Sequence, residues 1–505
     1  MTVSDFSPLR FLRRAALRHP ARTSMIWVRN QQPLETAERW TVAETLSRCV
    51  ALSELLKRDG VTAGDRIAVV GRNSPWHLAA WVAGAAFPAA IIPLSEVLPD
   101  RDLSYILAQS SPKVVLCADE MTQRLQSIYP SATVRTWSEL AVLRSTAENL
   151  DAAATAIEVN RSLGTIPACD EQAGAIIYTS GTASKPKGCV LSYANLWWGC
   201  ANFREAFEYS PNCVEGVCAP LSHIGGFNGT TTDLFSNGGT VVIFERFEPR
   251  VVLQAIAQFK IEMMFAVPTM FRLLAEAAAS CEADTSSFTR ALVGGAAWDT
   301  ELAARLIALG WGPINIWGMT EQSASGACLT TDMISGRESA VGLPFPHLDV
   351  RVRDAELECR GPSVTSGYFL APELNAAAFT PDGWFRTGDL GFIDDSGFLH
   401  LQGRREDTIN TGGEKVLAAR VSAVLCEHPR VRQAAVIGIP DPKWGHVVAA
   451  VIVAAGAAPT LDELQEYAQP QLAKFEVPRL LAVVDALPLN AHGKPDREAL
   501  SALFS

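Results

Sequence analysis

Short apolar runs alternate with segments of helical periodicity over roughly the first 400 residues. Polar or Gly/Pro turns separate the two kinds of segment. The apolar runs include Arg66–Val70, Lys113–Cys117, Thr240–Phe244, Met263–Val267 and Ala291–Val293. Strands that alternate with helices in this way are typical of layers built around mostly parallel sheets. The pattern predicts one large, subdivided α/β region.

Two apolar segments could be mistaken for targeting or membrane signals. The N-terminus has its apolar positions at helical spacing and lacks a cleavable apolar core, so an amphipathic first helix is expected, with a transit peptide as the alternative. The uncharged stretch Leu78–Leu94 is shorter than the ~20 residues of a membrane span and contains Pro88 and Pro93. It predicts a buried helix followed by a core strand, and no membrane span.

The pattern of hydrophobic, charged and turn-forming residues changes after Gly397. A short strand at 398–404 leads into a charged segment, a turn at Gly412–Gly413, a helix near Ala418–His428 and a strand at 434–440. A compact α+β unit of about a hundred residues fits this pattern and the common size of domains. Between the two regions, Val350–Gly361 predicts a short surface hairpin without functional consequence.

Composition and charge narrow the class of protein. The 505 residues exceed what one hydrophobic core supports, and 48% apolar with 19% charged residues indicates a globular chain. A net charge of −11 disfavours nucleic acid or an anionic membrane as a partner. The 11 cysteines show no metal-binding spacing, which favours reduced thiols in a cytoplasmic protein.

The segment Ala175–Leu191 carries the most informative chemistry. An apolar strand enters a loop whose hydroxyls, backbone N–H groups and lysines suit phosphate oxygens. The candidate phosphate ligands are Thr179, Ser180, Gly181, Thr182 and Lys187. The spacing is not that of a Walker A loop. The sequence predicts a phosphate-binding loop, and an ordinary Ser/Thr-rich surface turn is the alternative.

This loop resembles the signature T-S-G-T-[ST]-G-x-P-K-G of the adenylate-forming superfamily, from which Ala183 and Ser184 depart. That superfamily comprises acyl- and aryl-CoA ligases, adenylation domains of peptide synthetases and beetle luciferases. Further segments similar to its signatures follow in the family's order. They are Trp317–Glu321, Thr387–Asp389, Gly403–Asp407 and Gly493–Lys494. The resemblance implies a large N-terminal α/β domain over residues 1–402, a hinge at 403–407 and a small mobile α+β domain over 408–505.

The resemblance also implies roles at the nucleotide. A carboxylate attacks the α-phosphate of ATP to give an acyl-adenylate, and the protein supplies positioning and neutralising charge. Glu321 would hold Mg²⁺, Thr320 would contact the α-phosphate, and Asp389, backed by Arg404, would accept hydrogen bonds from the ribose. The residues implied to lie along the adenine are Gly294, Gly295, Ala296, Trp317 and Gly318.

The C-terminal residues are implied to serve both half-reactions. Lys494 would neutralise the carboxylate and the α-phosphate during adenylation, and is the expected catalytic lysine. Glu406 stands at the position of the hinge, where the family usually has Asp or Lys. After rotation, Gly412 and Trp444 would border the tunnel for the pantetheine arm, where a side chain at 412 would obstruct.

The acid itself would bind beside Pro220–Gly226, which resembles the P-L-x-H-x-x-G segment of acyl- and aryl-CoA ligases. The implied pocket residues are His223, Gly225, Asn228 and Met319. Ile224 stands where amino-acid adenylating domains usually have aspartate, which disfavours an α-amino acid. Asp233 has the position of a helix-surface residue. The small residues of this region predict a closed pocket for an aromatic or a short-to-medium acyl acid.

The resulting hypothesis is an acyl- or aryl-CoA ligase that uses a small carboxylic acid, ATP, Mg²⁺ and CoA. Lys474 and Arg479 would meet the CoA phosphates, whereas Glu476 stands where lysine is frequent. For that reason a carrier-protein pantetheine, presented in trans, remains the alternative acceptor. A luciferase-like oxidation and a nucleotide-binding scaffold without catalysis are the other hypotheses.

Overall fold

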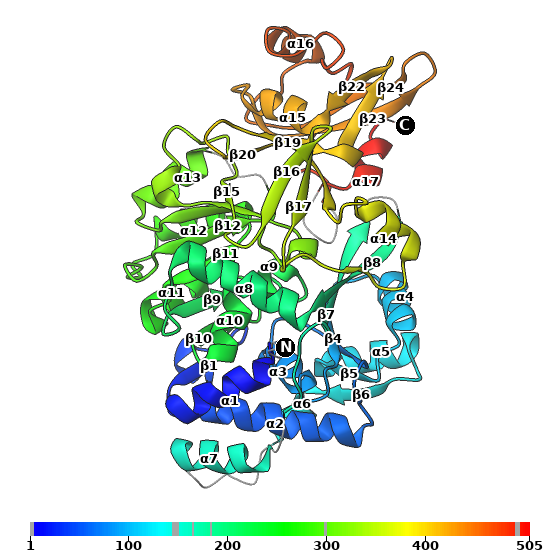
Figure 1. Cartoon of the computed structure of the whole chain (residues 1–505). Coiled ribbons are helices and arrows are strands. Elements are labelled where there is room, and N and C mark those ends of the chain that lie inside the picture. The colour runs from blue at the N-terminus through cyan, green and yellow to red at the C-terminus, as the bar shows by residue number, and fades with distance from the viewer. Residues whose placement is uncertain are drawn as a thin grey trace. The chain divides into compact units, whose positions relative to one another are not determined.

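The computed structural model describes residues 5–143, 151–163, 166–181, 184–296, 300–489 and 495–504 (Figure 1). The chain forms two compact units. The first contains Met1–Asp349 and Cys359–Phe385, and the second contains Val350–Glu358 and Arg386–Ser505. Strands that precede residue 403 thus cluster with the C-terminal part of the chain. The border at 402 and the hinge at 403–407, which rest on motif positions, stay predictions.

The first unit contains two large sheets. The order of the nine-stranded sheet is β15 (Leu343–Pro344), β14 (Ala327–Leu329), β13 (Pro313–Trp317), β12 (Arg290–Gly294), β11 (Met263–Ala266), β9 (Val214–Val217), β10 (Thr240–Phe244), β1 (Thr23–Val28) and β2 (Glu38–Thr41). The order of the seven-stranded sheet is β18 (Gly367–Tyr368), β8 (Ser184–Ser192), β7 (Ala173–Gly181), β4 (Ala90–Leu94), β3 (Arg66–Val70), β5 (Val114–Cys117) and β6 (Thr133–Thr136). The central pairs are parallel, as the alternation of strands and helices predicts.

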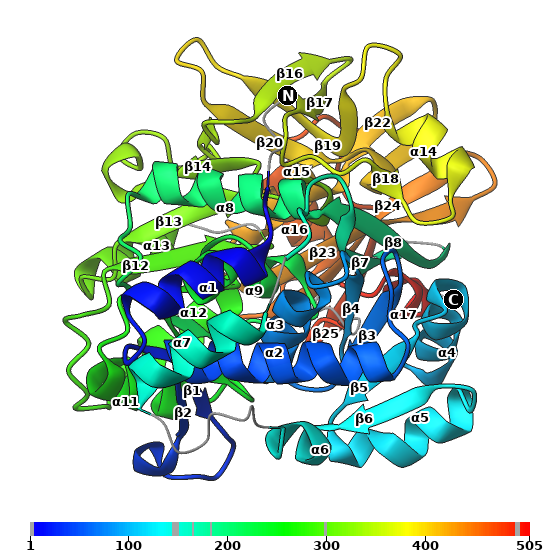
Figure 2. The same cartoon turned by 60° about the horizontal axis from the view of Figure 1, so that its bottom comes forward.

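Helices cover these sheets and lie between them. The helices of this unit are α1 (Pro8–Arg18), α2 (Val42–Arg58), α3 (Pro75–Gly84), α4 (Asp100–Ser110), α5 (Thr122–Ile128), α6 (Trp137–Ala141), α7 (Ala152–Ser162), α8 (Tyr193–Phe207), α9 (Ile224–Phe227), α10 (Thr230–Asn237), α11 (Pro249–Phe259), α12 (Pro268–Ala278), α13 (Thr300–Ala308) and α14 (Pro372–Ala378). Helices α1, α2, α3 and α7 run side by side (Figure 2). A capping box at the start of α2, between Thr41 and Glu44, satisfies backbone N–H groups there.

The period-2 alternation of the strands divides the core of the nine-stranded sheet into two layers. Met25 and Ile243 belong to the larger hydrophobic cluster, which extends to the second sheet. Ile26 and Val242, their neighbours along the same strands, belong to a separate cluster with α11, α12 and α13. Successive side chains of a strand point to opposite faces, so a strand covered on both sides reads as a continuous apolar run.

Several expectations from the sequence are confirmed in detail. The strands β3 and β10 have the predicted bounds, and α1 is the expected amphipathic first helix. The stretch Leu78–Leu94 is indeed the buried helix α3 and the core strand β4. One expectation is wrong: the segment after Tyr178 is not an open loop, because β7 continues to Gly181 and pairs antiparallel with β8.

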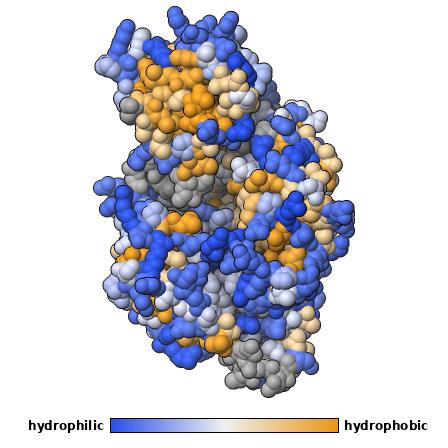
Figure 3. Space-filling model, turned by 180° about the vertical axis from the view of Figure 1, so that it is seen from behind, coloured by the Kyte–Doolittle hydropathy of each residue, from blue (hydrophilic) through white to orange (hydrophobic). Residues whose placement is uncertain are grey.

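The second unit has two smaller sheets. A four-stranded sheet contains β16 (Asp349–Arg353), β17 (Glu356–Arg360), β19 (Phe385–Ile393) and β20 (Leu399–Arg404). A five-stranded sheet contains β22 (Glu414–Leu417), β21 (Thr408–Thr411), β24 (Gly445–Ala454), β23 (Val431–Asp441) and β25 (Leu480–Val484), and the helices are α15 (Ala418–Cys426), α16 (Leu461–Ala468) and α17 (Arg497–Ala502). One face of the larger sheet packs on α15 and α16, and the other on α17. Hydrophobic residues also gather on the surface of this unit (Figure 3).

The cysteines and the helices agree with the expectations from composition. All 11 cysteines are free thiols, and only Cys426 is exposed. Across the residues that the structure describes, every helix is too short or too polar to cross a membrane.

A buried carboxyl group lies in the middle of the nine-stranded sheet. Glu215 on β9 is 1% exposed and accepts hydrogen bonds from the hydroxyls of Thr230 and Thr231 at the start of α10. Burial raises its pKa to about 8, although the two hydroxyl hydrogen bonds lower it. The folded chain therefore keeps this carboxyl protonated at neutral pH.

The titration of Glu215 makes stability depend on pH. Between the ordinary pKa of 4.5 and about 8, the folded chain holds a proton that the unfolded chain has released, so stability falls as the pH rises through this window. The Tm of the natural chain should therefore fall between about pH 5.5 and about pH 8.5. We expect the Tm of Glu215→Gln, which keeps the acceptor oxygen, to fall by roughly 3–5 °C less over the same range. Calorimetry measures this difference. The exposed Glu301→Gln is the control, and equal pH profiles for all three proteins would contradict the prediction.

Candidate active site

The predicted phosphate loop is a β-hairpin in the first unit. Thr179 on β7 lies opposite Lys187 on β8, and the backbone of Ser180 and Gly181 completes β7. Thr182 lies outside the described residues. The Lys187 ammonium is 5.7 Å from the ring centroid of Tyr368 on the neighbouring strand β18. The hairpin thus presents a hydroxyl residue and a lysine side by side near its tip.

A tight turn follows β13 and carries the next predicted site residues. Trp317 ends the strand, and Thr320 begins a short 3-10 turn that ends at Gln322. A side chain at Gly318 would lie 2.1 Å from the carbonyl oxygen of Ala324. The backbone N–H of Ala324 donates to the carbonyl of Met319. Only glycine at 318 lets the chain fold back this closely, which places Thr320 and Glu321 just beyond the end of the strand.

Glu321 is held by a segment that motif reasoning missed. The Tyr368 hydroxyl donates to Glu321 Oε1 at 2.8 Å, and the backbone N–H of Thr365 donates to the Glu321 carbonyl at 2.8 Å. Because Tyr368 also faces Lys187, the structure brings the predicted magnesium ligand and the phosphate hairpin together. Burial, with the Glu321 charge as a smaller cause, raises the pKa of the adjacent Cys189 thiol, which agrees with a packed residue and not a nucleophile.

The predicted acid and adenine segments meet at a phenylalanine. A side chain at Gly225 would lie 2.6 Å from Cε1 of Phe265, and one at Gly294 would lie 2.9 Å from Cε2 of the same ring. Gly294 pairs with Ile316 across β12 and β13, directly before Trp317. His223 precedes α9, and its carbonyl accepts the N–H groups of the first turn. The sequence analysis did not name Phe265 as a site residue, since a half-buried Phe on a strand such as β11 gives no distinct signal.

The remaining adenine residues follow β12 directly. Gly295 adopts φ +81°, the left-handed region, where glycine is favoured, and Ala296 next to it is exposed. The chain therefore turns sharply where the adenine segment was predicted.

Asn228, which is predicted to line the acid pocket, is hydrogen-bonded within the protein. Its amide donates to the carbonyls of Leu196 and Ser323 at 3.3 and 3.2 Å, and it accepts from the Thr232 hydroxyl at 2.7 Å. A side chain at Gly199 would meet this amide at 2.7 Å. Because both polar atoms of the Asn228 amide have partners within the protein, the side chain is fixed and is not a free group for a substrate.

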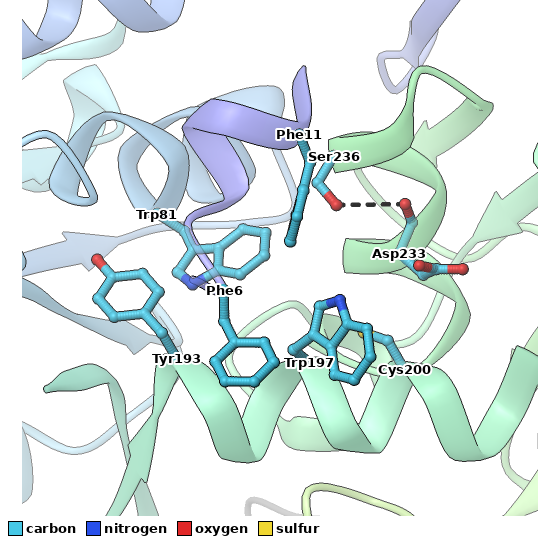
Figure 4. Close-up of a pocket in the computed structure, with 8 residues that line it drawn as sticks. All are labelled: Phe6, Phe11, Trp81, Tyr193, Trp197, Cys200, Asp233 and Ser236. Atoms are coloured by element: carbon cyan, nitrogen blue, oxygen red, sulfur yellow. Dashed lines mark hydrogen bonds between the residues drawn. The ribbon is translucent and has the colours of Figure 1, made fainter. Parts of the chain in front are cut away.

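A separate hollow is lined by residues of α1, α3, α8 and α10 (Figure 4). It has about 240 Å³ of empty space, part of it open solvent, and its lining residues are Phe6, Phe11, Trp81, Tyr193, Trp197, Cys200, Asp233 and Ser236. Cys200 both lines it and contacts Asn228. The buried Nε1 of Trp81 has no hydrogen-bond partner among the described residues. A water molecule in the hollow would satisfy such a group.

The prediction for Asp233 is wrong. The residue is 5% exposed, and it accepts hydrogen bonds from Arg204 through both carboxylate oxygens and from the Tyr209 hydroxyl at 2.7 Å. A single sequence does not reveal that Arg204, 29 residues earlier, neutralises it. This ion pair fastens α10 to α8 and leaves the carboxylate no role toward an acid.

Asp389 and Arg404 pair within the second unit. The Arg404 Nε lies 2.6 Å from Asp389 Oδ1, and the two residues face each other across β19 and β20. Glu356, on the hairpin expected to have no functional consequence, accepts the Gly388 N–H at 3.0 Å and binds Arg405 at 2.8 Å. The hairpin therefore holds the predicted ribose segment, a contact that the sequence analysis missed.

The predicted pantetheine residues also meet in the second unit. A side chain at Gly412 would lie 2.6 Å from Cε3 of Trp444, and Gly412 donates its N–H to the Trp444 carbonyl. The Arg479 guanidinium stacks 4.5 Å from the Trp444 ring centroid. Glu476 is buried, and its carboxylate accepts a hydrogen bond from the Ala473 N–H. It therefore stabilises the local turn and does not face solvent.

Two predicted residues remain, Glu406 and Lys494. Glu406 lies in a short 3-10 turn, and its carbonyl accepts two hydrogen bonds from Arg497. Its function as a hinge stays a prediction. Lys494 lies outside the described residues.

Comparison with known proteins matches both units. The AMP-binding enzyme family matches residues 12–369, and the AMP-binding enzyme C-terminal domain matches residues 420–494. The chain is 32% identical to a feruloyl-CoA synthase from Amycolatopsis sp over 466 residues, which cover 90% of this chain and 92% of that protein. It is 29% identical over 472 residues to an indoleacetate–CoA ligase from Aromatoleum aromaticum, with coverages of 90% and 91%.

Comparison with solved structures gives the same family relationship. o-Succinylbenzoate-CoA synthetase from Bacillus subtilis, in complex with its acyl-adenylate intermediate, gives a TM-score of 0.83 at 27% identity and 97% coverage of each chain. MatB from Rhodopseudomonas palustris, with ATP bound, gives 0.85 at 25% identity and 99% coverage of each chain. The chain therefore has the adenylate-forming fold, and it belongs to the AMP-binding enzyme family.

Proposed function

We propose that this protein is an ATP-dependent acid–thiol ligase that makes an acyl- or aryl-CoA. The carboxylate oxygen of the acid attacks the α-phosphorus of ATP, and pyrophosphate leaves. The CoA sulfur then attacks the acyl carbon, the thiol proton is released, and AMP leaves. The observation that carries the proposal is Glu321, held at the end of β13 beside the Lys187 hairpin. The CoA ligases among the relatives support the same reaction.

Magnesium fits this arrangement. Mg²⁺ prefers one or two protein carboxylates together with substrate phosphates, and Glu321 supplies such a carboxylate next to the phosphate hairpin. The ion would neutralise charge on the phosphates during the attack. Thr179 and Lys187 would bind phosphate oxygens, and Thr320 would contact the α-phosphate. A B. subtilis relative has been solved with ATP and a magnesium ion.

The substrate we propose is an aromatic acid of moderate size. The Phe265 ring packs directly against Gly225 of the predicted acid segment and Gly294 of the adenine segment, and such an aromatic side chain can stack with the ring of an aryl acid. Asn228, a predicted acid-pocket residue, is held by the carbonyls of Leu196 and Ser323, which disfavours a pocket that extends past it for a long chain. Named relatives act on feruloyl, indoleacetate and 2-succinylbenzoate groups, all of them aryl acids.

CoA is the acceptor that we favour over a carrier protein. Arg479 lies on the Trp444 ring beside Lys443, which gives the second unit a basic, aromatic surface next to Gly412. Such a surface suits the phosphates and the adenine of CoA. Glu476, the residue that argued for a carrier protein, is buried and engaged within its own segment. A carrier-protein pantetheine remains the second candidate.

The decisive experiment is pyrophosphate release from MgATP across aryl, short, medium and long carboxylic acids. Each acid is tested alone, with CoA, and with a pantetheine-loaded carrier protein. We expect release that depends on an aryl acid, with a CoA thioester as product. A thioester formed only on the carrier protein would transfer the proposal to that acceptor. Nucleotide binding without release for any acid would favour the scaffold hypothesis.

A further inference from the structure

Tyr368 links two parts of the nucleotide site that lie far apart in the sequence. Its hydroxyl donates to Glu321 Oε1 at 2.8 Å, and its ring centroid lies 5.7 Å from the Lys187 ammonium. No motif considered above includes this residue. A single side chain therefore contacts the proposed metal ligand with its polar end and faces the phosphate lysine with its ring.

The backbone of Tyr368 is fixed on both sides. Its strand, β18, pairs with β8 so that Tyr368 lies opposite Cys189, and the next N–H, that of Phe369, donates to the Gly188 carbonyl at 2.7 Å. The Asn375 side chain accepts from the Tyr368 N–H at 2.6 Å and donates to its carbonyl at 3.1 Å. The phenol is therefore presented by a rigid element and not by a surface loop.

Glu321 is restrained at two points by the same segment. The Glu321 carbonyl accepts a hydrogen bond from the Thr365 N–H. The Glu321 carboxylate accepts one from the hydroxyl of Tyr368, which follows Thr365 by three residues. A donor on Oε1 fixes the rotation of the carboxylate and leaves Oε2 available as a metal ligand. Hydrogen bonds to ligating carboxylates are a general means of orienting them and tuning metal affinity.

We propose that Tyr368 is a positioning residue for the magnesium-binding carboxylate Glu321. It sets the orientation of this group against the Lys187 hairpin before the nucleotide binds. The inference rests on the proposed function, because it takes Glu321 as the metal ligand. Tyr368 does not contact the reacting atoms in this proposal, and it acts only through Glu321.

Metal affinity is the readout that a merely structural role would not change. Tyr368→Phe removes the hydroxyl and keeps the ring over Lys187. Mn²⁺ binding is measured by electron paramagnetic resonance in the presence of the non-reacting analogue α,β-methylene-ATP. We expect Tyr368→Phe to weaken Mn²⁺ binding about tenfold and to raise the Mg²⁺ concentration needed for adenylation by a similar factor. The KM for the acid and the Tm should remain close to those of the natural chain.

The matched control is Tyr178→Phe on strand β7 of the neighbouring hairpin, whose hydroxyl donates to Gln109 and not to Glu321. It should bind Mn²⁺ as the natural chain does. Equal affinity for Tyr368→Phe and this control would overturn the inference. Tyr368→Leu, which also removes the ring, tests the second contact and should weaken the binding of the nucleotide itself.

A double-mutant cycle separates positioning from general damage. In Glu321→Gln the ligand charge is already lost, so adding Tyr368→Phe should weaken Mn²⁺ binding little further. Full additivity of the two losses would overturn the inference. Failure of the proposed function looks different: the natural chain would bind Mn²⁺ with the analogue, show the Tyr368 effect, and still release no pyrophosphate with any acid.

Discussion

Lys494→Ala should lower the rate of adenylate formation about 10³-fold and leave the affinity for ATP within a few-fold. The attacking carboxylate and the α-phosphate both carry negative charge, and an ammonium between them neutralises both as the new bond forms. Because this interaction is strongest in the transition state, its loss reduces kcat and not nucleotide binding. Acid-dependent exchange of pyrophosphate into ATP measures the first quantity, and equilibrium binding of ATP measures the second.

A second assay makes this prediction specific. With chemically prepared acyl-adenylate, Lys494→Ala should still form the CoA thioester, since the lysine serves only the first half-reaction. Lys494→Arg keeps the charge but not the shape of the group and should recover only part of the rate. Normal pyrophosphate exchange in Lys494→Ala would refute the catalytic assignment.

Gly412→Ala should have the opposite effect: adenylation close to normal, and thioester formation slowed about 10²-fold. The added carbon would lie 2.6 Å from Cε3 of Trp444, so the indole must move from its position beside Arg479. That movement would narrow or misalign the path proposed for the pantetheine arm. Thiol-dependent release of AMP from preformed adenylate measures the step.

Gly413→Ala is the matched control for this substitution. Gly412 and Gly413 both have positive φ, +60° and +89°, so alanine strains the backbone in either place, at roughly 1–2 kcal/mol. A side chain at 413 meets nothing within 4 Å. If both substitutions slow the thiol step equally, backbone strain is the cause and the tunnel assignment fails.

How much of this protein could be predicted from the sequence depended on the range of the interactions involved. The bounds of β3 and β10 followed from local apolar runs, because a strand buried on both faces needs every position apolar. The order of the signatures was enough to identify the family. The end of the hairpin strand β7 was misjudged, since hydroxyl residues and glycine suggest a loop when the partner strand is not known.

Contacts between distant segments escaped prediction. The bond between Tyr368 and Glu321 spans 47 residues, and Phe265 reaches Gly225 and Gly294 only because β11 lies beside β12 and β9 in the sheet. Asp233 was assigned to a surface because nothing local indicates its arginine partner. Each of these residues is ordinary by type, and only the topology of the sheets gives it a place in the site.

The chain passes between its two units three times, after Asp349, after Glu358 and after Phe385. A single proteolytic nick at one of these points would leave the units covalently joined through the others. The small unit is therefore not one continuous C-terminal segment that a protein engineer could exchange by itself. Grafting it onto a relative means exchanging two separate inserts, 350–358 and 386–505, and a single splice at residue 402 would separate Glu356 from its ion-pair partner Arg405.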